Sequence, residues 1–326
     1  MYHRKVVRAK FVLDKLEVKK MGTNIIENYG TPLNLGEAEN YLFCGALAKT
    51  MQRIGRQDFD YWFFSGVTGD TFTQVFSRNF NKYYDCLSSA IFGKTHLDNI
   101  FDAIGYDYEL VGNKEFYQAT EKHITKIKKW IDKDVPVIVK DTADSWYSLA
   151  VGYDGDAILK FDMLGDELQI YDFDLSNNSN YALVFVGDIT HEMNIAEIYK
   201  GAVLSVSALL NKTSTNEASF GKQAYIDWAD SLLVGRSEFA SDYFDWAGTN
   251  AHMNIVLNRA LVLNPSLKPI VDKLMEFSKL NAKLFPFSSE AQQALAENNK
   301  AKLEDISTKI RGLAAFCDET IRFYHV

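Results

Sequence analysis

The sequence predicts an α+β fold in which helices come first, an antiparallel sheet follows, and an all-helical segment ends the chain. Apolar side chains recur at helical spacing between about residues 44 and 133, and short apolar runs separated by tight turns follow from residue 135. Beyond residue 213 the pattern is helical almost throughout. Since strands and helices do not alternate, βαβ units are not expected. We therefore expect an α+β domain over residues 1–212 and a helical bundle domain over residues 213–326.

Length and composition agree with two folded domains. A chain of 326 residues is long for one hydrophobic core. With 47% hydrophobic and 24% charged residues it is globular by composition, and its formal charge of −8 argues against a nucleic-acid partner. The basic N-terminal stretch lacks the apolar core of a secretory signal, and no run of roughly 18 apolar residues is present. We expect a cytoplasmic protein that does not bind membranes.

The cysteines do not indicate a disulfide framework or a zinc site. Cys44, Cys86 and Cys317 are an odd number with no CxxC spacing, so each is expected to be a free thiol. The sequence gives no reason to expect a metal or an organic cofactor.

The first helix is expected to begin near Cys44 and to run for about twelve residues. The stretch "TPLNLGEAEN" supplies turn residues, and then Leu47, Met51 and Ile54 mark one helical face. The basic segment "KVVRAKFVL" before it fits either an edge strand or a short helix. The aromatic segment "FDYWFFSGVTGDTFTQVF" after it predicts buried structure broken by a tight turn at its glycines, near the cleft. Its glycine spacing is that of a phosphate loop, but the lysine of a P-loop is missing.

The remaining elements follow from similar signals. "THLDNIFDAIG" predicts a helix that ends at Gly105, "YELV" predicts a strand, and residues 115–133 predict a polar helix. The runs "VPVIVK", "WYSLAVGYDGDAILKFDML", "ELQIYDFD" and "NYALVFV" predict an antiparallel meander. The polar stretch at 209–223 marks the domain boundary. Beyond it, Pro265, Pro269 and Pro286 divide the sequence into several helices, the last of which carries a long apolar stripe over residues 303–324.

Cys44 has two interpretations. A small, soft residue at the start of a helix is commonly part of a hydrophobic core. The same place also suits a nucleophile, because the unpaired N–H groups and the positive end of the helix dipole stabilise a thiolate.

An ordered set of features resembles a known family. These are a cysteine opening a helix, the helix-to-strand step "AIGYDYELV", the strand "VPVIV" and the hairpin "VGYDGDAILKFD". In this order they look like the papain-like fold of bacteriocin-processing peptidases, and most of all like the butirosin-biosynthesis acyltransferase-like proteins, which also carry a C-terminal helical domain. The resemblance covers about residues 30–205 and, more loosely, the helical tail.

The resemblance implies a site around Cys44 as the nucleophile. The position of the family's upstream glutamine falls on Ala38, so the nearby amide that would complete the oxyanion site with the helix N–H groups is that of Asn40. The orienting acid falls on Asp162, and Gly45 and Trp146 would line the pocket. Trp146 stands where the family has its catalytic histidine, so the usual general base is missing.

Two functions of different classes remain open. The chain is either a cysteine acyltransferase or amide hydrolase acting through a thioester on Cys44, or a non-catalytic papain-like fold that binds a peptide, a small metabolite or a partner protein. For the enzyme, the resemblance implies a small-molecule or peptide substrate, with an acyl-carrier protein as a candidate donor and an amine as a candidate acceptor. The apolar helical domain suggests a homodimer. Of the six histidines, His252 and then His191 were the candidates for a replacement base, while His96 and His123 are expected to be ordinary helix residues.

Overall fold

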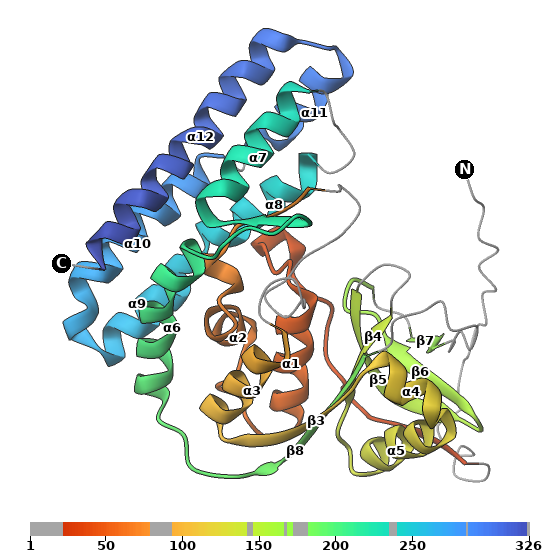
Figure 1. The fold of residues 1–326 in the computed structure, drawn as a ribbon. Helices are drawn as coiled ribbons and strands as arrows, with labels where there is room; N and C mark the ends of the chain where they lie inside the picture. The colour runs from red at the N-terminus through yellow and green to blue at the C-terminus, as the bar shows by residue number, and fades with distance from the viewer. Residues whose placement is uncertain are drawn as a thin grey trace.

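The computed structural model describes residues 22–78, 93–141, 146–165, 168–171, 182–234, 240–284 and 286–324. It confirms the α+β class, with helices beside an antiparallel sheet and further helices in the C-terminal part of the chain (Figure 1). The expected order is only partly right, because the strands at Thr23–Ile25 and Tyr106–Val111 join the sheet before the N-terminal helices are complete. Cys86 and the termini with His3 and His325 lie outside the described residues, as does the segment "KVVRAKFVL".

Within the described residues the main sheet has seven strands, and their pairings are antiparallel. Its order is β3-β8-β4-β5-β6-β7, with β1 pairing on β5 as well. Their bounds are β1 (Thr23–Ile25), β3 (Tyr106–Val111), β4 (Val137–Asp141), β5 (Trp146–Asp154), β6 (Ala157–Phe161), β7 (Leu168–Tyr171) and β8 (Ala182–Ile189). Strands β4 to β7 form the expected meander, but β8 returns to lie between β4 and β3. The local turn signals do not encode this return of β8 to the other side of β4.

Helices cover both faces of this sheet. Helix α1 (Leu42–Arg53) packs against β4 and β5 on one side, and α5 (Thr120–Asp132) packs on the other (Figure 1). The apolar stripe of each helix is buried against the sheet, as Met51 in α1 and Ile127 in α5 illustrate. The helix expected near Cys44 is thus confirmed, with twelve residues. The other helices nearby are α2 (Tyr61–Val67), α3 (Gly93–Ile104) and α4 (Asn113–Gln118).

The C-terminal helices form a bundle in which α12 lies along α7 (Figure 1). The helices from α6 on are α6 (Ile195–Leu210), α7 (Gly221–Leu233), α8 (Ala240–Ala251), α9 (Met253–Leu263), α10 (Lys268–Ala282), α11 (Phe287–Ala296) and α12 (Lys300–Phe323). Pro265 and Pro269 fall in the short 3-10 turn and first helical turn at the start of α10, and Pro286 precedes α11. The prolines therefore divide the helices as expected.

The two halves of the chain are held together by more than the linker. Strand β2 (Val75–Ser77) pairs with β9 (Ala218–Phe220), which lies beyond the expected boundary. Asp60 caps α2 by accepting from the Phe63 N–H, and it also receives two hydrogen bonds, at 2.7 and 2.8 Å, from Arg259 of α9. One continuous apolar cluster includes residues from both halves. The division at residue 212 stays a prediction, and the structure adds that elements on either side of it share a core.

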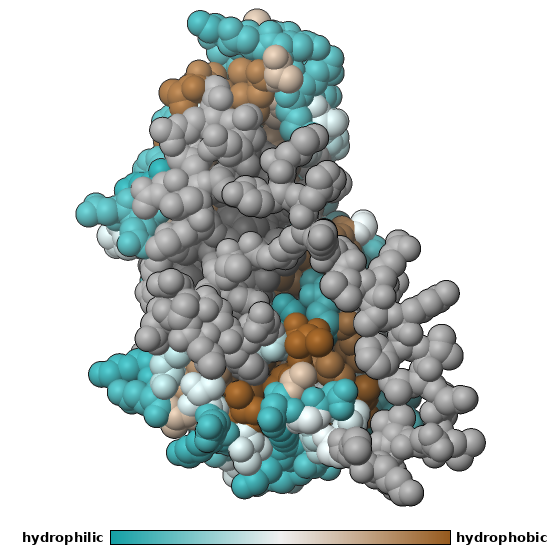
Figure 2. Space-filling view, turned by 90° about the vertical axis from the view of Figure 1, so that its right-hand side faces the viewer, coloured by the Kyte–Doolittle hydropathy of each residue, from teal (hydrophilic) through white to brown (hydrophobic). Residues whose placement is uncertain are grey.

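On the face shown in Figure 2, the described surface carries both hydrophilic and apolar residues. Hydrophilic residues dominate there, and a small apolar area lies among them (Figure 2). Among the described residues no helix combines the length and apolar composition needed to cross a membrane. Exposed apolar side chains such as Val262 and Phe323 lie at the ends of C-terminal helices. The homodimer stays a prediction.

Replacing Gly221 should destabilise the joint between α6 and α7. Gly221 has φ +51°, and a Cβ there would lie 2.2 Å from the Leu210 carbonyl oxygen. We expect Gly221→Ala to lower the free energy of unfolding by at least about 2 kcal/mol, because a left-handed conformation and a clash with rigid backbone add together. Gly201→Ala is the matched control, since a Cβ on this α6 residue meets nothing within 4 Å. It should stabilise by about 0.5–1 kcal/mol. Urea unfolding measures both, and equal effects would contradict this account.

Candidate functional site

Cys44 is the third residue of α1, inside the first turn. The N–H groups of this turn have no partner within the helix, as at every helix start. The Cys44 side chain is fully buried, with 0% of its surface exposed. Its position therefore suits a thiol that feels the helix terminus, while its burial closes it from bulk water in this conformation.

The sulfur of Cys44 lies against oxygen atoms. Its Sγ donates a hydrogen bond to Asp70 Oδ2 at 3.2 Å and lies 3.4 Å from Thr68 Oγ1. The Thr68 hydroxyl in turn donates to the same Asp70 oxygen at 2.8 Å. Asp70 is itself only 2% exposed. Thiol, hydroxyl and carboxylate thus form a buried triangle, which we call the Cys44–Thr68–Asp70 triangle.

A tight turn after α2 brings Asp70 back to α1. Helix α2 ends at Val67, Gly69 takes φ +84°, and residues 70–72 form one turn of 3-10 helix. A Cβ on Gly69 would lie 2.7 Å from the Leu209 side chain of α6, so the turn is also closely covered. The turn expected at "SGVTGDT" is confirmed. The contact of Asp70 with Cys44 was not predicted. An aspartate between aromatic residues, in a segment expected to be buried, was a signal that could have indicated it.

Two further groups border the triangle. The Nε2 of His96 lies 2.8 Å from the carbonyl oxygen of Thr68, and since a carbonyl only accepts, Nε2 carries the proton. The Tyr61 hydroxyl accepts from the Tyr41 N–H at 3.0 Å. Burial raises the pKa of Tyr61 well above its usual range, and the neighbouring Cys44 and Asp70 raise it further. The Tyr61 hydroxyl therefore keeps its proton near neutral pH.

Asn40 reaches the helical half of the protein. Its Nδ2 donates to Thr249 Oγ1 of α8 at 3.0 Å, and Thr249 donates to the Ala38 carbonyl at 2.9 Å. The Thr249 carbonyl also accepts from the Thr71 hydroxyl, at 3.3 Å. One residue of α8 thus fastens the segment before Cys44 and the segment after Asp70. The oxyanion role of Asn40 stays a prediction.

Gly45 is required by packing. A Cβ at Gly45 would lie 2.6 Å from the Leu33 side chain. The Leu33 N–H bonds to the Met163 carbonyl at 2.8 Å, so the absence of a side chain lets the loop after β6 approach α1. A substrate contact of Gly45 stays a prediction.

The elements carrying Asp162 and Trp146 lie next to each other and next to α1. Asp162 follows β6 and accepts from the Leu164 N–H at 3.0 Å, which makes a local turn. The pairing of Leu149 with Phe161 puts this end of β6 beside the first residues of β5. The Phe43 and Tyr147 rings, 4.9 Å apart, bring the start of α1 against the start of β5. The side chain of Trp146 lies outside the described part, so its convergence with Cys44 and Asp162 stays a prediction.

The other described histidines lie away from the triangle's hydrogen bonds, and His123 has a buried Nδ1 without a hydrogen-bond partner. His252 stacks on Trp62 at 5.6 Å and its Nδ1 lies 2.8 Å from the Gly248 carbonyl. His191 lies 3.0 Å from the Thr190 hydroxyl, and His123 is buried in α5. The sequence favoured His252 over His96, whereas the structure connects His96 to the triangle through the Thr68 carbonyl.

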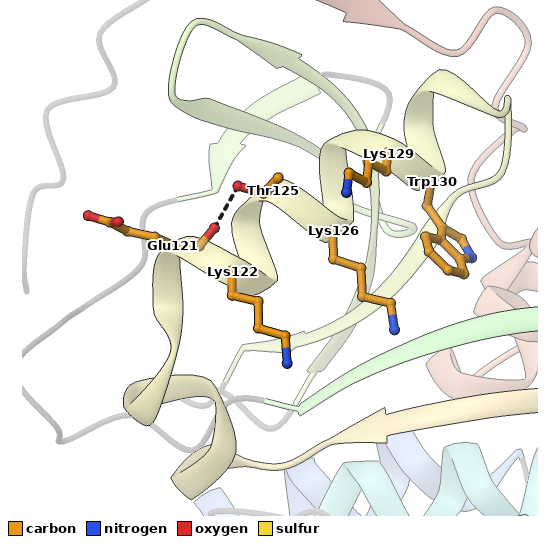
Figure 3. A pocket seen from close by; sticks show the side chains of 6 residues that line it. All are labelled: Glu121, Lys122, Thr125, Lys126, Lys129 and Trp130. Carbon is orange, nitrogen blue, oxygen red and sulfur yellow. Dashed lines mark hydrogen bonds between the residues drawn. The ribbon is translucent and has the colours of Figure 1, made fainter.

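A concave feature lies on α5, away from these residues. It has a volume of about 490 Å³ and is lined by Glu121, Lys122, Thr125, Lys126, Lys129 and Trp130 (Figure 3). Lys126 is ion-paired with Glu109, and the Trp130 ring is fixed by its donation to the Val186 carbonyl at 2.9 Å. Lys122 and Lys126 point the same way, but Lys129 points to another side (Figure 3). The lysines do not converge on one point.

Comparison of the sequence with protein-family models and with curated proteins finds no match. Within the described residues no group of three or more His, Cys, Asp or Glu side chains has metal-binding geometry. Function must therefore be argued from the geometry around Cys44.

The buried Tyr61 predicts a loss of stability at alkaline pH. Its pKa is raised on folding, so its contribution is present below the ordinary tyrosine value of about 10 and is lost as the pH rises above it. Tyr61→Phe removes this ionisation, so the free energy of unfolding should fall less steeply with pH, by about 1.4 kcal/mol per unit. Urea unfolding from about pH 9 to about pH 11 measures the slopes. Parallel slopes for the two proteins would contradict the prediction.

Proposed function

We propose that the protein is a papain-like cysteine acyltransferase or amide hydrolase that forms a thioester on Cys44. The observation that carries this is the hydrogen bond from the Cys44 thiol to the buried Asp70 carboxylate. A cysteine used only for packing would have an apolar environment, because burying a carboxylate costs free energy that packing alone does not require.

The arrangement of elements supports a papain-like assignment. A cysteine in the first turn of a helix, packed against an antiparallel sheet that follows it in the chain, is what the resemblance implies. The start of β5, where the family places its histidine, lies against this helix turn. The acid at the end of the next strand, Asp162, is also present.

Formation of a thioester on Cys44 requires both a base and an oxyanion site. A cysteine at its free pKa of about 8.5 is only a few per cent thiolate at neutral pH. The N–H groups in the first turn of α1 stabilise negative charge, and a donor to an oxyanion is worth roughly 3 kcal/mol in other enzymes. Asn40 is the candidate side-chain donor, and an acyl-carrier protein or another acyl donor supplies the group that an amine or water then accepts.

A non-catalytic binding function is the second candidate. The observation in its favour is the complete burial of Cys44, since a substrate must reach the sulfur before it can react. In this case the fold binds a peptide, a small metabolite or a partner protein, and the triangle only stabilises the turn after α2.

Alkylation separates the two functions. Cys317 is the internal control, because it is also fully buried and because burial, followed by Asp318, raises its pKa. We expect iodoacetamide to label Cys44 at least about tenfold faster than Cys317 from about pH 5 to about pH 9, since a reactive thiol must open to substrate. Mass spectrometry of the peptides assigns each adduct. Equal, slow labelling of both residues would reject the enzyme and leave the binding function.

A further inference from the structure

We propose that Asp70 is the general base of the Cys44 site and does the work of the missing histidine. This inference rests on the proposed function. It makes Asp70 a catalytic residue, since its carboxylate contacts the thiol that reacts, and makes Thr68 a positioning residue for that carboxylate.

The distances fix the direction of proton transfer. The Thr68 hydroxyl has one proton, and its short contact, 2.8 Å, is with Asp70 Oδ2. The Cys44 proton also points to this oxygen, at 3.2 Å. The third contact, 3.4 Å between Cys44 Sγ and Thr68 Oγ1, does not require a proton between these two atoms. The carboxylate is thus the described acceptor for the thiol proton.

The Nε2 atom of the neighbouring imidazole, that of His96, is not placed for this role. His96 uses Nε2–H to donate to the Thr68 carbonyl, and the contact holds the backbone of the turn. A ring nitrogen that donates there does not accept from the sulfur. Burial of Asp70 means that the proton passes directly between sulfur and oxygen.

Each step balances with Asp70 as the only proton carrier. As the Cys44 sulfur attacks an acyl carbon, the S–H proton moves to Asp70 Oδ2 and the carbonyl oxygen gains the electron pair. Deprotonation is coupled to attack because the thiol becomes more acidic as the S–C bond forms. Collapse of this intermediate breaks the bond to the leaving group, which takes the proton from Asp70, and the thioester remains. An amine or water then attacks the thioester, passing one proton to Asp70, and the departing sulfur recovers it.

The test uses p-nitrophenyl acetate as the acyl donor and the full chain as the enzyme. Wild-type protein should release a burst of p-nitrophenolate while its mass rises by one acetyl group on Cys44. Asp70→Asn keeps the shape of the side chain but removes the base, so the burst should slow by ~100-fold or more. Asp58→Asn, a surface carboxylate paired with Arg56, is the matched control and should leave the burst unchanged.

A second pair of variants tests whether the Thr68 hydroxyl positions the Asp70 carboxylate. Thr68→Val should slow the burst about tenfold, and Thr68→Ser, which restores a hydroxyl, should recover it. A merely structural role would make both variants equally slow. Circular dichroism and thermal unfolding establish that each variant is folded.

The outcomes distinguish a failure of the proposed function from a failure of the assignment of Asp70 as the base. If Cys44→Ala keeps the burst, the proposed function fails. If the burst requires Cys44 but Asp70→Asn retains the wild-type rate, only the assignment of Asp70 fails. Should Asp70→Asn not fold, the wild type decides after treatment with diethyl pyrocarbonate, which acylates imidazoles. An unchanged burst supports Asp70. A burst that is lost while mass spectrometry finds adducts on histidines and an unmodified Cys44 overturns it in favour of a histidine.

Discussion

The site depends on the burial of one carboxylate, that of Asp70. Removing a charged group from water costs several kcal/mol unless hydrogen bonds replace its hydration. The thiol of Cys44 and the hydroxyl of Thr68 supply two of these bonds to one oxygen. The position of α1 and the geometry of the turn after α2 are thereby coupled, because moving either would leave the carboxylate short of partners.

The C-terminal helices support this arrangement from outside. Thr249 of α8 bonds to the segments on both sides of the triangle, and Arg259 of α9 holds the capping residue of α2. The β2–β9 pairing continues the same contact along the chain. The helical half thus packs against the site from a second side, through Thr249 and Arg259.

Two electrostatic effects oppose each other at Cys44. The end of α1 favours a negative sulfur, whereas an adjacent carboxylate disfavours it, since two negative charges would share one buried site. Both groups lie against the same sulfur, the first turn of α1 through its position and Asp70 through a hydrogen bond. A papain-like site with an imidazole would instead store the thiolate as an ion pair.

Local sequence determined much of the fold. The spacing of Leu47 and Met51 predicted a helix of about twelve residues where α1 lies. The turn residues predicted the hairpins from β4 to β7, and the prolines predicted the breaks between the last helices. These features depend on contacts a few residues apart, which periodicity and turn chemistry encode. The position of Cys44 in the first turn of α1 followed for the same reason.

Only the tertiary structure decided which groups surround that thiol. Asp70 reaches Cys44 across 26 positions of the chain, Thr249 reaches Asn40 across 209, and β8 enters the sheet between two strands that come much earlier. Sequence patterns carry no distance information at such separations. The sequence therefore identified a candidate nucleophile, whereas packing selected the carboxylate beside it, because burial makes a charged group bond to whatever polar partners the fold brings near.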